Sequence, residues 1–124
     1  MMKMRTITRY ATTTLIAAIL YAPVPATAAD YAPLDCPRAK TRSEKTICSN
    51  YGLGQLEARM ATLYAWATSL VAMGQRGDIQ DAQRAFITKR EACKSSVACM
   101  TNVYSDRIKQ LDAVMSRISE KGPF

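Results

Sequence analysis

Four cysteines are the residues of this chain best suited to chemistry, and their spacing favours cross-links over metal binding or redox catalysis. They are Cys36, Cys48, Cys93 and Cys99, separated by eleven, forty-four and five residues. The chain therefore has no Cys-x-x-Cys pair, and it has no histidine to complete a zinc site. An even number of cysteines in a small exported chain is typical of disulfides. We expect structural disulfides, no metal and no cofactor.

The pairing of these cysteines is open from sequence alone, because four cysteines allow three connectivities. We favour Cys36–Cys48 and Cys93–Cys99, since both pairs close short local loops. On the chain-entropy model each bond stabilises the fold by roughly 2–3 kcal/mol.

Carboxylates are the remaining candidates for catalysis, because a chain without histidine cannot form a Ser-His or Cys-His nucleophile pair. The acidic residues available for acid–base chemistry are Glu44, Glu57, Glu91, Asp106 and Asp112. None lies in a recognisable site pattern, and acidic residues on helices usually face solvent. We therefore expect no enzyme, and keep a small carboxylate hydrolase as the weakest of three hypotheses.

The N-terminus is typical of an export signal. Lys3, Arg5 and Arg9 precede an apolar stretch centred on residues 15–20, and the small residues 26–28 offer a cleavage site. The stretch is shorter than the roughly 18–20 residues that span a bilayer, and no lipoprotein pattern precedes the first cysteine. The sequence thus predicts a signal peptide over residues 1–28 and a periplasmic or secreted bacterial protein without a stable membrane anchor.

The length and net charge of the mature chain limit the size of its core and the partners it can bind. Removing 28 of 124 residues leaves 96, which suffices for one small core. The net charge of +7 falls to +4, because three basic residues and no acidic residue leave with the signal. No basic run is interleaved with aromatic residues, so we expect no nucleic-acid partner.

The rest of the sequence predicts helices. Residues 29–40 read as an extended lead-in, and Thr41 with Glu44 matches a capping box that opens a short helix to about Cys48. Asn50 and the glycines after it should break that helix. A stripe of apolar residues at three- and four-residue steps over 53–71 then predicts a long helix.

Two more helices complete the expected fold. We expect Asp78 to cap a helix that ends near Cys93, and a last helix to run from about Val97 to the stop at Gly122. Three main helices joined by short turns run up, down and up. The predicted fold class is all-α: a small antiparallel three-helix bundle over residues 41–124, with a short N-terminal helix and disulfides at one pole.

Five further residues are candidates for structure or partner binding. Arg90 lies on the predicted core face, and its guanidinium could form a bidentate ion pair with Glu44. This pair would be either an internal contact that orients the short helix or part of the lining of a partner-binding groove. Tyr64 and Tyr104 fall at core positions, with hydroxyls expected to find local acceptors. Trp66 falls off the apolar stripe and is a candidate contact residue.

The residue pattern from Asp35 to Leu111 resembles the lysozyme inhibitor LprI-type domain. The motifs that carry the resemblance are Cys36, Ser43-Glu44-Lys45-Thr46-Ile47-Cys48, Leu53-x-x-Leu56, Tyr64, Gln83-x-x-Phe86-x-x-x-Arg90-x-x-Cys93, Cys99-Met100 and Tyr104-x-x-Arg107-x-x-x-Leu111. This chain departs from the family pattern with Glu57 for aspartate, Phe86 for tryptophan and Met100 for leucine. These replacements keep charge or bulk.

The resemblance implies an exported, helical, disulfide-bearing binding module whose partner is a protein, with host lysozyme as the namesake's target and peptidoglycan protection as the outcome. No inhibitory motif transfers residue by residue. The alternative hypothesis is a structural or stress-related envelope protein that binds another periplasmic protein or an anionic cell-wall polymer without inhibiting lysozyme. The sequence does not choose an oligomeric state.

Overall fold

The structure is a computed structural model that describes residues 31–121. The predicted signal peptide lies outside these residues, as does the expected stop at Gly122. The described chain contains a short 3₁₀ helix, η1 (Cys36–Arg38), and four α-helices: α1 (Arg42–Ser49), α2 (Tyr51–Leu70), α3 (Met73–Ala92) and α4 (Val97–Ser119). Residues 31–121 include no strand, so the expectation of an all-helical fold is confirmed.

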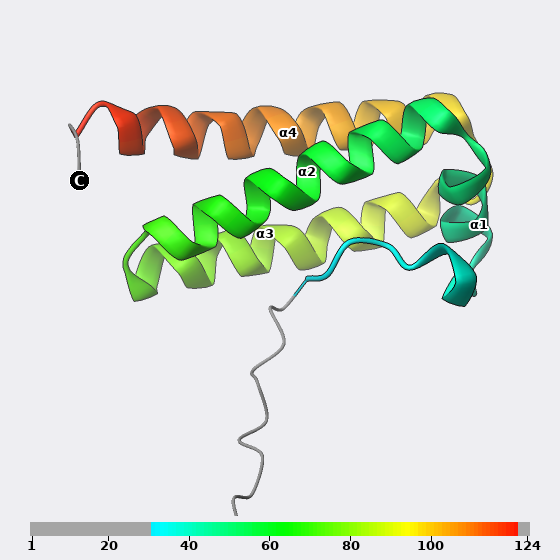
Figure 1. The fold of residues 1–124 in the computed structure, drawn as a ribbon, viewed down its shortest axis with the longest axis horizontal. Coiled ribbons are helices and arrows are strands. Elements are labelled where there is room, and N and C mark those ends of the chain that lie inside the picture. Colours follow the sequence, from blue (N-terminus) through cyan, green and yellow to red (C-terminus); the bar gives the residue numbers. More distant parts are fainter. Residues whose placement is uncertain (1–30, 122–124) are drawn as a thin grey trace, which may run out of the picture.

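The three long helices lie side by side, with successive helices running in opposite directions (Figure 1). α2 packs most extensively against α4, and α3 contacts both. α1 sits across one end of this group, where it contacts α2 and α3. We call this end, which holds η1, α1, the start of α2, the turn between α3 and α4 and both disulfides, the disulfide end. The opposite end, where α2 passes into α3, is the distal end.

Side-chain caps fix where α1, α2 and α4 begin. The Thr41 hydroxyl accepts the Glu44 backbone N–H and the Glu44 carboxylate accepts that of Thr41, which is the predicted capping box. The Asn50 side chain accepts the Leu53 N–H at 3.0 Å and starts α2 directly after α1. The glycines that follow Asn50 therefore lie in the first turn of α2 and do not form a break. Ser96 caps α4 in the same way.

The start of α3 differs from the prediction. The helix begins at Met73 without a side-chain cap, so Asp78 lies inside it and was wrongly expected to be its N-cap. Gly74 and Gly77 lie within the first turns of α3. Arg76 supplies the reason: its Nε donates to the Thr68 carbonyl oxygen at 2.7 Å and ties the beginning of α3 to the end of α2.

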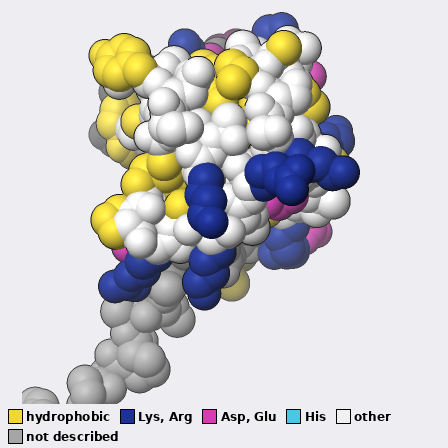
Figure 2. Space-filling model, turned by 90° about the vertical axis from the view of Figure 1, so that its right-hand side faces the viewer, with side chains coloured by type: hydrophobic (Ala, Val, Ile, Leu, Met, Phe, Trp, Pro, Cys, Tyr) yellow, Lys and Arg dark blue, Asp and Glu magenta, His cyan; other side chains and the backbone are white. Residues whose placement is uncertain are grey.

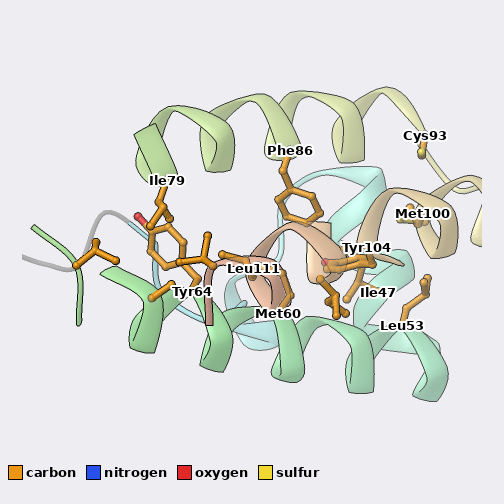
Figure 3. Close-up of a cluster of buried hydrophobic side chains, with 14 of the residues drawn as sticks. Ile47, Leu53, Met60, Tyr64, Ile79, Phe86, Cys93, Met100, Tyr104 and Leu111 are labelled. Atoms are coloured by element: carbon orange, nitrogen blue, oxygen red, sulfur yellow. The ribbon is translucent and has the colours of Figure 1, made fainter. Parts of the chain in front are cut away.

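The core runs the length of the molecule between α2, α3 and α4, and α1 closes it with Ile47 (Figure 3). Tyr104 and Phe86 meet edge to face with ring centroids 5.1 Å apart. The most deeply buried apolar side chains include Ile47, Leu53, Met60, Met100, Tyr104 and Leu111. The predicted apolar stripe of the long helix thus faces the core over most of its length, but Leu70, which was expected on it, is 45 % exposed; Trp66 lies off the stripe.

Candidate functional site

Two disulfides hold the disulfide end together. Cys36 is bonded to Cys48 and Cys93 to Cys99, with Cα–Cα distances of 5.6 Å in both, and no described cysteine is free. The first bond ties the lead-in to α1, and the second closes the turn between α3 and α4. These are the two pairs that loop length favoured.

A buried carboxylate lies next to this end, at a position that the sequence identified only as an available acidic residue. Glu57 on α2 is 5 % exposed. Its Oε1 accepts the Tyr31 hydroxyl at 2.5 Å and the Leu34 N–H at 3.1 Å, and its Oε2 accepts the Tyr104 hydroxyl at 2.6 Å. Glu57 therefore fastens the lead-in to the bundle and joins α2 to α4.

Arg90 on α3 is 4 % exposed and completes this network. Its guanidinium donates twice to Glu91 Oε1, at 3.0 and 3.3 Å, and once to the Tyr31 hydroxyl at 3.2 Å. It also lies 3.9 Å from Glu57 Oε2. The acidic partners of Arg90 among the described residues are therefore Glu57 and Glu91, and the expected clamp onto Glu44 is replaced by these contacts.

Glu44 has a different role from the one expected. Its Oε2 accepts the backbone N–H groups of Lys40 at 2.7 Å and Thr41 at 3.0 Å, so it caps α1. Glu44 and Arg90 do line the same shallow hollow of about 250 Å³ beneath the lead-in, together with Tyr31 and Asp35. They share a surface but are held by separate contacts.

The environment shifts the pKa values of these groups in opposite directions. Burial, reinforced by the Glu57 carboxylate, raises the pKa of the Tyr31 and Tyr104 hydroxyls well above the usual range. Backbone donors at Thr41 and Lys40 lower the pKa of Glu44. Both tyrosines thus stay protonated as donors, which keeps the network intact over the physiological pH range.

A second polar cluster joins α3 to α4 through residues that the sequence motifs include without a predicted contact. Arg107 is buried, and its Nε donates to Gln83 Oε1 at 2.8 Å while its Nη2 donates to the Ile79 carbonyl oxygen at 2.9 Å. Burial lowers the pKa of Arg107. The Gln83 amide contacts Met60 Sδ at 3.2 Å. No buried side-chain polar atom of the described residues lacks a hydrogen-bond partner, so both clusters suit a structural role.

The remaining candidates divide between core and surface. Tyr64 is 2 % exposed and meets the Tyr31 ring edge to face, 5.8 Å between centroids. Trp66 is 57 % exposed on α2. One turn further along the same face Leu70 is exposed, and Met73 at the start of α3 is 82 % exposed. The distal end therefore presents large apolar side chains to solvent.

The described residues offer no further chemical centre. Within 31–121, no group of three or more histidine, cysteine, aspartate or glutamate side chains is arranged to hold a metal ion. No helix of this part of the chain is both long and apolar enough to cross a bilayer. Comparison with protein-family models, curated proteins and solved structures gave no match.

Proposed function

We propose that the chain is an exported binding module of LprI type, a disulfide-stapled three-helix bundle that acts in the periplasm by blocking lysozyme and so protecting peptidoglycan. The observation that carries the proposal is the exposed apolar group at the distal end, Trp66, Leu70 and Met73. Tryptophan and methionine are enriched at protein interfaces, and a few such anchors supply most of the binding energy.

The distribution of charge over the molecule favours the distal end as the site of such a contact. Animal lysozymes of the usual type are strongly basic, so a contact surface with excess positive charge is unfavourable. Residues 35–48 and 89–99, which lie at the disulfide end, hold seven basic and three acidic side chains, whereas the other described residues hold seven and six. The nearly neutral part of the molecule, which includes the distal end, is therefore the better face for a basic partner.

The buried polar clusters support binding rather than catalysis. Both oxygens of Glu57 accept short hydrogen bonds from tyrosine hydroxyls, so this carboxylate is held as a structural acceptor.

A turbidity assay tests the proposal. Lysis of bacterial cell walls by a basic animal lysozyme is followed with and without the oxidised mature protein, residues 29–124. We expect wild-type protein to slow lysis, and the double variant Trp66→Ser, Met73→Ser to lose at least tenfold in inhibitory potency.

The control is Tyr51→Ser, because Tyr51 is 84 % exposed but lies at the disulfide end. This variant should inhibit as wild type does. No slowing of lysis at a large excess of mature protein contradicts the proposed function, and equal loss in both variants contradicts its assignment to the distal end.

A further inference from the structure

The positive charge of this molecule is concentrated at one end. Residues 31–121 contain fourteen basic and nine acidic side chains, an excess of five. The disulfide end alone, as residues 35–48 and 89–99, accounts for an excess of four. Figure 2 views the molecule from this end and shows Lys and Arg side chains spread over the middle and lower parts of the face, with few acidic side chains among them.

The cations of this face are available to a partner. Lys40, Arg42, Lys45 and Lys94 are exposed, and none of them forms an ion pair within residues 31–121. Their positions on one end follow from the two disulfides and from the contacts of α1 with α3 and η1.

The acidic residues of the same end are already occupied. Glu44 caps α1 through two backbone N–H groups. Glu91 receives two hydrogen bonds from Arg90. Asp35 lies 3.2 Å from the Arg38 guanidinium. The two ion pairs leave the exposed lysines and Arg42 in excess over the remaining carboxylate, Glu44, so the field outside this face is positive.

Lys94, one of these cations, has a backbone conformation that other residue types adopt more easily. Lys94 has φ 55° and is the non-glycine residue with positive φ in the described chain. Glycine or asparagine adopts this conformation at lower cost. The left-handed conformation is common just after a helix C-terminus, and Lys94 follows the C-cap Cys93 of α3, so its charge lies beside the Cys93–Cys99 bond.

Exposed apolar groups accompany the cations. Tyr51 and Val97 begin α2 and α4 at this end and are 84 % and 41 % exposed. Tyr51 also borders a mostly apolar hollow with Leu34, Ile47 and the Cys36–Cys48 bond. Hydrophobic side chains lie along the upper and left margin of the face in Figure 2.

We propose that the disulfide end binds the surface of an anionic lipid bilayer. Lysines and arginines close to such a surface each add to binding, and tyrosine is favoured at the boundary between headgroups and acyl chains. A soluble polyanion would use the cations but would gain nothing from exposed Tyr51 and Val97. The contact is peripheral and reversible, and it does not rest on lysozyme inhibition.

Vesicle co-sedimentation tests this inference. Oxidised mature protein is mixed with vesicles of equal parts phosphatidylglycerol and phosphatidylcholine, or of phosphatidylcholine alone, at low and high salt. We expect binding to the anionic vesicles only, weakened by salt. The double variant Lys40→Gln, Lys45→Gln should bind about 25-fold more weakly, at about fivefold for each cation removed.

The matched control is Lys109→Gln, Lys121→Gln, which makes the same charge change on α4 and beyond it, away from the disulfide end. It should bind within about threefold of wild type, because charges beyond a Debye length of the surface are screened. Tyr51→Ser should weaken binding at both salt concentrations. Equal losses in the two double variants, or binding to soluble polyphosphate with none to vesicles, overturns the inference.

Discussion

Replacing Glu57 is the sharpest test of what holds the lead-in to the helices. In Glu57→Gln the shape is kept, but the charge is lost and one of the two acceptor oxygens is replaced by an NH2 group, which donates and cannot accept. Hydrogen bonds to a charged group contribute about 1.5–3 kcal/mol each, and those between neutral groups about 0.5–1.5. One tyrosine hydroxyl, now at 2.5 or 2.6 Å from a carboxylate oxygen, therefore keeps only a neutral acceptor, and the other must turn to accept from the NH2 group, at a cost of about 1 kcal/mol each. We expect Glu57→Gln to lower the free energy of unfolding by about 2 kcal/mol.

The ion pair with Arg90 adds less to this loss than the tyrosine bonds do. The two charges are 3.9 Å apart, at the limit of contact, and Arg90 keeps its two bonds to Glu91 in the variant. Glu57→Leu has a larger effect, because it leaves the fully buried Tyr104 hydroxyl without its acceptor. That costs about 1–3 kcal/mol more, for a total of about 4.

Urea denaturation followed by circular dichroism and by the fluorescence of Trp66, the single tryptophan, measures both losses. The control is Asp112→Asn, which removes the exposed ion pair with Arg59 and should change stability by less than about 1 kcal/mol. The reasoning is refuted if Glu57→Gln is as stable as the control, or if the leucine variant is no less stable than the glutamine variant.

Three other outcomes follow from the same contacts. Because the folded state raises the pKa of Tyr31 and Tyr104, their contribution is fully present below about pH 10 and is lost above it, where the unfolded chain releases the protons. The urea concentration at the midpoint of unfolding should fall as the pH is raised from 8 to 11. It should fall less in the double variant Tyr31→Phe, Tyr104→Phe. Thr41→Ala should cost about 1 kcal/mol through loss of the α1 cap, and Thr41→Ser should restore most of it. Replacing Cys93 and Cys99 by serine should cost about 2 kcal/mol, read from the same denaturation curves.

Much of the fold could be predicted because the sequence patterns that determine it are local. The capping box at Thr41 and the periodic apolar stripe after residue 53 depend only on neighbouring residues, and both appear where expected. The start of α3 was misplaced because its decisive contact is not local. The Arg76 bond to the Thr68 carbonyl joins two helices, so the residues around Asp78 give no local sign of it.

The buried network was harder to foresee. Arg90 was identified as a cation on a core face, but its partners come from other elements, and sequence spacing cannot rank Glu44 against Glu57. A signal for Glu57 was present: it lies four residues after Leu53 and three before Met60, both buried, and so falls on the apolar stripe of α2. A carboxylate on such a stripe needs buried donors, which indicates that nearby tyrosines point inward.

The two proposed surfaces lie at opposite ends of the same helices, and this separation has a functional consequence. α2 has 20 residues and is therefore about 30 Å long, so Trp66 near its end lies far from Tyr51 at its start. A lipid surface at the disulfide end leaves the distal end facing outward, free to contact a protein. Lysozyme inhibition should accordingly persist when the protein is bound to anionic vesicles. Loss of inhibition on vesicles would mean that the two contacts share one face.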